Sequence, residues 1–198
     1  MTSSEAARAY WRQHGEKPPR ATLVRALEGF AGRKGEAVDL GCGIGRDTLP
    51  LLRAGWRVLA VDREVQAIAR LAERAADEGL AAGLTTRVAT IEEVAIPSCD
   101  LVVASFSLFG LGEAFDEVWS RITAALRPGG RFAGQLLGPE DSWTGRPGMA
   151  VVDRARLDSL LAGWRIELCE EEHAPAVTPA GQTKHWHLWH VVAGRPER

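Results

Sequence analysis

Short apolar runs alternate along most of the chain with segments whose apolar residues recur at helical spacing. Five apolar runs predict strands, at residues 37–40, 56–61, 84–89, 99–105 and 131–137. Four amphipathic segments predict helices, at residues 22–30, 47–53, 65–77 and 115–126. The run at 99–105 is apolar without alternation, which is typical of a strand that helices cover on both faces of a parallel sheet.

The two ends of the chain follow other patterns. Residues 2–14 predict a short helix with a capping box at its start. Near the C-terminus a helix capped by Asp153 precedes two strands, at 165–169 and 184–193, which no helix separates and which therefore pair antiparallel. The whole pattern predicts an α/β fold: a Rossmann-like, doubly wound, seven-stranded sheet, mostly parallel with an antiparallel last strand and helices on both faces.

The first predicted strand ends in a turn with glycine at alternate positions, Gly41, Gly43 and Gly45. Glycine permits backbone angles closed to other residues and has no Cβ to keep a ligand from the main chain. In a doubly wound sheet, ligands bind beyond the carboxyl ends of the strands at the point where the strand order reverses. The turn therefore predicts a site for a nucleotide-like ligand.

Asp39 stands two positions before the first glycine and changes the expected ligand. Dinucleotide sites place a pyrophosphate at such a turn, and a carboxylate there would repel it. The same carboxylate would attract an ammonium or a sulfonium group. This charge argument favours S-adenosylmethionine over NAD.

Several segments, taken in order, resemble the class I S-adenosylmethionine-dependent methyltransferases. The turn resembles their first motif, and Asp62 ends a strand like their second, whose acid binds the ribose hydroxyls. Residues 89–93, 100–106 and 126–132 resemble the third motif, the fourth motif and the turn after the following helix. The resemblance implies these cofactor-binding residues: Asp39, Gly41, Gly43, Gly45, Arg46, Asp62, Arg63, Thr90, Ile91 and Ser105. Thr90 is a departure, since many relatives have an acid there for adenine.

The C-terminal third narrows the resemblance to methyltransferases of the tellurite-resistance type and their small-molecule relatives, through residues 134–138, 141–143 and 181–187. This resemblance implies methyl transfer to a small molecule, with a metalloid oxyanion as one option. Two alternatives stay open: a non-catalytic regulatory protein that binds S-adenosylmethionine, and an NAD-dependent oxidoreductase.

One domain is expected over residues 1–198. It would comprise a helical N-terminal cap at 1–35, a cofactor-binding core at 36–137, and a lid loop, helix and strand pair at 138–198. We expect Tyr10 and Trp11 of the cap, together with Arg20, to close the site from the N-terminal side. The glycine- and proline-rich loop at 138–149 has the composition of a lid.

The stretch from Lys184 to His190 alternates aromatic residues and histidines on a predicted strand. His185 and His187 share one face, so they are candidates for a catalytic base or a group that orients the acceptor, because histidine titrates near neutral pH. Packing and metal binding are the alternatives. No nearby cysteine or carboxylate completes a set of metal ligands, so we expect none.

Three aromatic residues, Phe106, Phe109 and Trp143, fall near strand ends in this topology and are candidates for an apolar wall over the acceptor. Core packing is the competing interpretation. Cys42 lies inside the glycine turn without a base nearby in the sequence, which favours a packing residue over a nucleophile.

The charge balance of 24 Lys and Arg against 26 Asp and Glu gives a net charge of −2, without the positive field that attracts nucleic acid. A small-molecule acceptor is thus expected, with no nucleic acid or membrane partner, in a monomer or homodimer. Three widely spaced cysteines suggest no disulfide framework. Because neither a leader nor a run of about 18 apolar residues is present, we expect a cytoplasmic protein.

Overall fold

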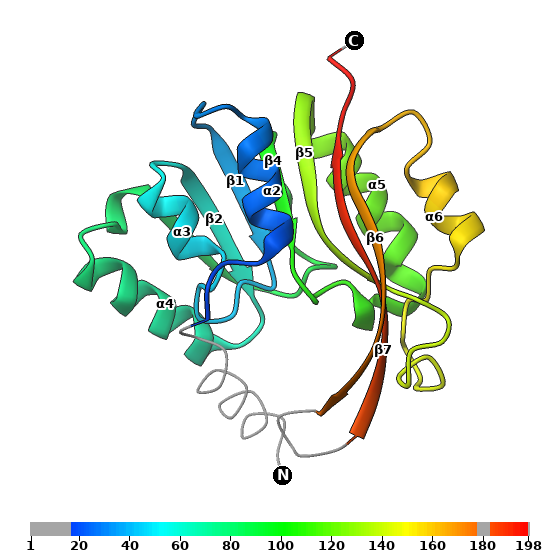
Figure 1. Ribbon diagram of the computed structural model, residues 1–198. Coiled ribbons are helices and arrows are strands. Elements are labelled where there is room, and N and C mark those ends of the chain that lie inside the picture. Colours follow the sequence, from blue (N-terminus) through cyan, green and yellow to red (C-terminus); the bar gives the residue numbers. More distant parts are fainter. Residues whose placement is uncertain (1–16, 178–182, 198) are drawn as a thin grey trace.

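The computed structural model describes residues 17–177 and 183–197, in which helices and strands alternate as the sequence predicts (Figure 1). The predicted helix at 2–14, with Tyr10 and Trp11, lies outside the described residues. So do Gly181 and Gln182.

The described strands form one seven-stranded sheet in the order β3-β2-β1-β4-β5-β7-β6. Their bounds are β1 (Glu36–Leu40), β2 (Arg57–Asp62), β3 (Leu84–Val88), β4 (Cys99–Ala104), β5 (Leu126–Leu137), β6 (Arg165–Val177) and β7 (Thr183–Gly194). The first five pair in parallel, and β7 runs antiparallel to both β5 and β6. The predicted sheet is confirmed.

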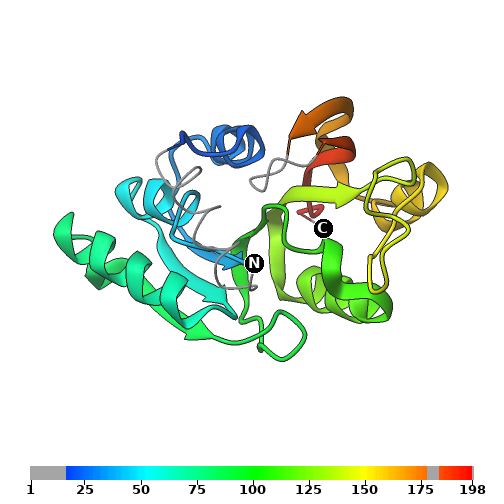
Figure 2. The same cartoon turned by 90° about the horizontal axis from the view of Figure 1, so that it is seen from below.

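Helices cover both faces of the sheet (Figure 2). Their bounds are α2 (Ala21–Gly29), α3 (Thr48–Arg53), α4 (Val65–Asp77), α5 (Phe115–Ala125) and α6 (Arg154–Leu160), with short 3-10 helices η1 (Ala81–Gly83) and η2 (Phe109–Ala114). Leu23, Leu49 and Leu71 of the first three helices share one buried cluster. Phe115 and Leu157 of the last two lie in another. Within the described residues, no helix is both long and apolar enough to cross a membrane.

Two elements differ from the prediction. β5 begins at Leu126, directly where α5 ends, because that residue already has extended backbone angles. β6 runs through Val177 rather than ending at Cys169, so the three glutamates at 170–172 lie within the strand. As the edge strand of the sheet, β6 exposes alternate side chains, and a charged run is compatible with it.

The β6–β7 hairpin extends past the carboxyl end of β5 (Figure 1). The β5 pairing stops at Leu137, opposite Leu188, whereas β6 pairs with β7 back to Thr183. Because β1, β2, β4 and β5 are parallel, the carboxyl ends of these strands share that same edge. The hairpin and the glycine turn therefore border the region in which a doubly wound sheet binds its ligands.

Candidate functional site

The glycine turn closes tightly against the end of β2. The amides of Gly41 and Cys42 both donate to the carbonyl oxygen of Val61, at 2.8 and 3.0 Å. Gly41 and Gly45 have φ angles of +77° and +90°, a left-handed region that L side chains rarely adopt.

A side chain would also not fit at these two positions. A Cβ at Gly41 would collide with the Cβ of Ser107, and a Cβ at Gly45 would collide with Leu71. The neighbouring Ser107 hydroxyl oxygen is buried and has no hydrogen-bond partner in the described part of the chain. It lies beside Gly41 at the turn.

Asp62 ties the end of β2 to the turn. Its Oδ2 accepts from the Gly43 amide at 2.8 Å, and its Oδ1 accepts from the Glu64 amide at 2.9 Å. An ionised carboxylate has about four acceptor positions, so two backbone bonds leave acceptor capacity for ligand hydroxyls.

Asp39 is buried beneath the turn, where the Thr48 hydroxyl donates to its Oδ2 at 2.6 Å. Burial raises the pKa of Asp39 to about 8; the charges of Asp47 and Asp62 add to the rise, and the Thr48 hydrogen bond opposes it. A cation bound nearby would favour the ionised form. The buried acid therefore suits a positively charged ligand.

Asp47 is the second buried carboxylate at this turn, after Asp39; Asp62 is half-buried. It precedes α3 without capping it by a side-chain hydrogen bond. Instead, the Arg20 amide donates to Oδ1 at 2.9 Å, and the Ser105 hydroxyl donates to Oδ2 at 2.7 Å. These bonds join the segment before α2 and the end of β4 to the turn.

Other predicted cofactor residues make local contacts. Arg46 Nε donates to the Pro18 carbonyl oxygen at 2.8 Å, and the Arg63 side chain is 72% exposed, 3.8 Å from Glu64.

At the end of β3, the Thr90 hydroxyl donates to Glu93 Oε2 at 3.0 Å, and the Ile91 carbonyl oxygen accepts from Arg121 at 2.8 Å. Their predicted role in binding adenine stays a prediction.

The structure brings the three predicted aromatic residues together with Trp186. The Phe106 ring centroid lies 5.7 Å from that of Phe109 and 5.6 Å from that of Trp186, and Trp143 lies 5.2 Å from Trp186. Phe106 has a φ of +59°, which is unusual outside glycine. Arg20 Cζ sits 4.1 Å from the Phe106 ring centroid, so this aromatic cluster adjoins the residues that contact Asp47.

A buried ion pair beside the aromatic cluster was missed by sequence reasoning. Lys184 Nζ bonds to Asp141 and lies 4.0 and 3.9 Å from the ring centroids of Trp143 and Trp186. Burial lowers the pKa of Lys184, although Asp141 opposes that effect. Asp141 also accepts from the amides of His187 and Trp143, at 3.1 and 2.9 Å. The predicted lid loop is thereby fixed to β7 at this point.

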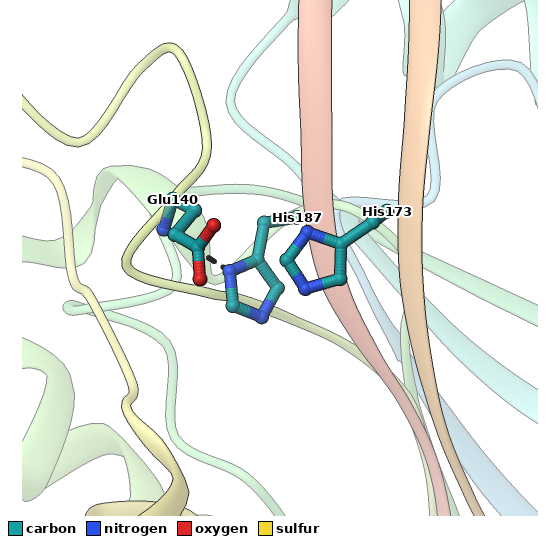
Figure 3. A group of neighbouring side chains, drawn as sticks. All are labelled: Glu140, His173 and His187. Atoms are coloured by element: carbon teal, nitrogen blue, oxygen red, sulfur yellow. Dashed lines mark hydrogen bonds between the residues drawn. The ribbon is translucent and has the colours of Figure 1, made fainter.

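The candidate catalytic histidines lie in the extended part of the hairpin. His187 is buried, with Nδ1 accepting from the Glu140 amide at 3.0 Å (Figure 3). The nearest oxygen of Glu171 lies 3.0 Å from its Nε2. His185 Nε2 lies 3.3 Å from His173 Nδ1.

The premise that no carboxylate lies near these histidines is therefore wrong. The antiparallel pairing of the C-terminal strands, continued past the predicted end at residue 169, sets His173 opposite His187 and could have found these neighbours.

Cys42 is buried inside the turn. Burial raises the pKa of its thiol well above the ordinary value, and the charges of Asp39 and Asp62 add to the rise. Since the thiolate is the nucleophile, this environment favours the packing role.

Comparison with known proteins agrees with this arrangement. Residues 37–130 match a family model described as a methyltransferase domain. A probable cobalt-precorrin-6B C(15)-methyltransferase (decarboxylating) from Methanothermobacter thermautotrophicus is 34% identical over 103 residues, which is 51% of this chain and 52% of the relative. The chain thus spans about half the length of this curated relative.

Two solved structures share the fold. TehB from Haemophilus influenzae has a TM-score of 0.78 at 17% identity, over 96% of this chain and 67% of TehB. A 1,6-didemethyltoxoflavin-N1-methyltransferase from Burkholderia thailandensis, solved with its acceptor and S-adenosylhomocysteine, has a TM-score of 0.68 at 23% identity, over 98% of this chain and 84% of the other. Residues 37–130 are thus similar to a methyltransferase domain, and the chain shares the fold of these two solved structures.

Proposed function

We propose that the protein binds S-adenosylmethionine at the glycine turn and transfers its methyl group to a small molecule. The observation that carries this proposal is the group of three carboxylates, Asp39, Asp47 and Asp62, around a turn that brings backbone close to a ligand. Such a site favours a ligand with a sulfonium and an ammonium group and disfavours a pyrophosphate.

The acidic residues around the turn bind different parts of the cofactor. Asp62 accepts hydrogen bonds from the ribose hydroxyls through the acceptor positions that Gly43 and Glu64 leave open. Asp47 supplies negative charge toward the cationic end, and Asp39 adds to it when the bound cation favours its ionised form. When bound, S-adenosylmethionine would supply a methyl group from its sulfonium sulfur, with the thioether S-adenosylhomocysteine as the leaving group. The chain's main contribution is to hold the acceptor in line with that bond, which accounts for large rate effects without a dedicated catalytic group.

The acceptor binds next to the aromatic cluster of Phe106, Phe109, Trp143 and Trp186. Planar rings prefer such surroundings, and Arg20 adds positive charge for an anionic acceptor. In the metal-free protein, His185 and His187 are the candidate bases for an acceptor that must lose a proton. The net charge of −2 supports a small molecule over nucleic acid. A metalloid oxyanion remains one acceptor to test.

Calorimetric titration tests the cofactor directly. We expect S-adenosylhomocysteine to bind at one site per chain and NAD to show no heat above dilution. Binding of NAD with no binding of S-adenosylhomocysteine would overturn the proposal and favour an oxidoreductase.

A screen of small heteroaromatic, phenolic and metalloid acceptors, with S-adenosylhomocysteine release as the readout, then tests catalysis. Turnover with one acceptor class supports the enzyme. Tight cofactor binding without turnover across that panel would favour the regulatory alternative.

A further inference from the structure

Three potential metal ligands from three elements meet in the β6–β7 hairpin (Figure 3). His173 of β6 and His187 of β7 are direct partners in the strand pairing, and their ring centroids lie 4.0 Å apart. Glu140 comes from the loop after β5. One ligand atom of each of these residues lies within 4.8 Å of the other two.

Glu171, on the same strand as His173, lies beside both histidines. Its Oε1 lies 3.2 Å from His173 Nε2 and 3.0 Å from His187 Nε2. Zinc binds imidazole nitrogen and carboxylate oxygen at about 2.0–2.2 Å in tetrahedral geometry, so two ligands of one ion lie roughly 3.3 Å apart. The distances from Glu171 Oε1 to the two imidazole nitrogens therefore match those between ligands that share one small cation.

His187 Nε2 provides an independent indication. The residue is 2% exposed, yet Nε2 has no hydrogen-bond partner among the described residues, although Glu171 lies within ion-pair distance. Because a buried polar atom without a partner is costly, this nitrogen indicates a ligand that the hairpin can accept.

We propose that the hairpin binds one divalent metal ion such as zinc. Its ligands would be His173, His187, Glu140 and Glu171. Two imidazoles with two carboxylates suit zinc and its neighbours nickel and copper, and disfavour the all-oxygen coordination of magnesium and calcium.

The surrounding residues support this coordination. With His173 bound through Nε2, its Nδ1–H faces His185 Nε2 at 3.3 Å. A metal-bound histidine usually donates its other ring N–H to an acceptor, which fixes the orientation of the ring. His185 is thus a positioning residue for His173.

Metal binding also has a structural consequence for the loop after β5. Coordination through His187 Nε2 leaves the ring proton on Nδ1, where the Glu140 amide now donates at 3.0 Å. Two donors cannot share that contact, so the Glu140 segment must shift when the ion binds. The Asp141 and Ser142 bonds to β7 adjoin this segment, so the ion and the loop are coupled.

Zinc titration of the full chain without an affinity tag, in competition with a chromophoric chelator, tests the site. We expect one ion per chain. His173→Ala and Glu171→Gln should each weaken zinc affinity by at least about tenfold, and His185→Ala by about tenfold. His190→Ala is the matched control, because this β7 histidine contacts Glu172 instead, and we expect its zinc affinity to stay unchanged.

His187 is buried, so His187→Ala alone would not separate misfolding from lost coordination. The variants at His173 and Glu171 change exposed residues, and S-adenosylhomocysteine binding by each confirms its fold if the cofactor site is as proposed; circular dichroism confirms it otherwise. The proposal is overturned if the His173→Ala/Glu171→Gln double variant binds zinc as tightly as the unchanged protein, or if His190→Ala loses as much affinity.

Hydrogen exchange adds a readout independent of affinity. The Glu140 amide should exchange faster in the zinc-saturated protein, because its acceptor is lost. Unchanged exchange at Glu140, with zinc bound, would overturn coordination through His187 Nε2.

Discussion

Asp62 is the single residue on which cofactor binding depends most. Its carboxylate has two backbone donors and faces the glycine turn, and each hydrogen bond to a charged group contributes about 1.5–3 kcal/mol. We expect Asp62→Ala to weaken S-adenosylhomocysteine binding by at least about tenfold in calorimetry. Asp77→Ala, at an exposed position at the end of α4, is the control. Wild-type affinity in Asp62→Ala would contradict the proposed ribose contact.

Asp39 makes stability depend on pH in an identifiable direction. Its pKa is about 8 in the folded protein and 3.8 in an ordinary aspartate. The folded state therefore keeps a proton that the unfolded chain releases, so this contribution to stability is present below pH 3.8 and is lost as pH rises toward 8.

Urea unfolding of the cofactor-free protein and of Asp39→Asn, between pH 5 and 9, measures this loss. We expect the stability of the unchanged protein, relative to the variant, to fall with pH by up to about 1.4 kcal/mol per unit and to level off above pH 8. Parallel stability curves would show that Asp39 titrates normally.

Among single residues, the sequence predicts those whose backbone conformation or hydrogen bonds are determined by the end of their own strand. Gly41, Gly45 and Asp62 were identified because a strand end and a following turn restrict them locally. The bond from Glu140 to His187 joins residues 47 positions apart. It depends on how the loop after β5 lies on β7, and no local pattern specifies that contact.

Among the elements, β6 shows that the pattern of polar and apolar residues does not determine the length of a strand. The acidic run from Glu170 to Glu172 resembles a solvated strand end, yet the strand continues to Val177 because β7 supplies a backbone partner along its whole length. Pairing with another strand decides the length of an edge strand, and side-chain polarity decides only which of its faces is exposed.

The loop after β5 and strand β7 are joined by the Asp141–Lys184 pair, both of whose side chains are buried. Asp141→Ala leaves the lysine without its partner and leaves the amides of Trp143 and His187 without acceptors. We expect a loss of about 3–5 kcal/mol in the free energy of unfolding, measured by urea denaturation.

Two further variants show how much of that loss of stability comes from the unpaired buried charge. Asp158→Ala removes an exposed ion pair with Arg154 and should cost no more than about 1 kcal/mol. Replacing both buried partners, in Asp141→Leu/Lys184→Met, should cost less than Asp141→Ala alone, because no charge is then left unpaired. A double variant as unstable as the sum of its single variants would show that the two residues act separately.

In the molecule as a whole, the sheet order divides the carboxyl edge into two parts. β1, β2 and β3 carry the glycine turn, Asp62 and Thr90, while β7 carries the histidines and Trp186 on the other side of β4 and β5. The alternation of strands and helices predicts the parallel half. An antiparallel last pair was predicted too, but the position of β7 between β5 and β6 was not, although its apolar run at 191–193 is typical of an inner strand.

This division predicts that cofactor binding and turnover can be separated by mutation. His185 lies in the β6–β7 hairpin, where its ring faces His173 and its backbone amide donates to the Ser142 hydroxyl. We therefore expect His185→Ala to bind S-adenosylhomocysteine with unchanged affinity in calorimetry. If His185 acts as the base, kcat for the acceptor found in the screen should fall by about 10²–10⁴-fold, and the pH–rate profile should lose its acidic limb. Unchanged kcat would remove His185 from the mechanism, whereas loss of cofactor affinity would show that the two parts of the edge are coupled.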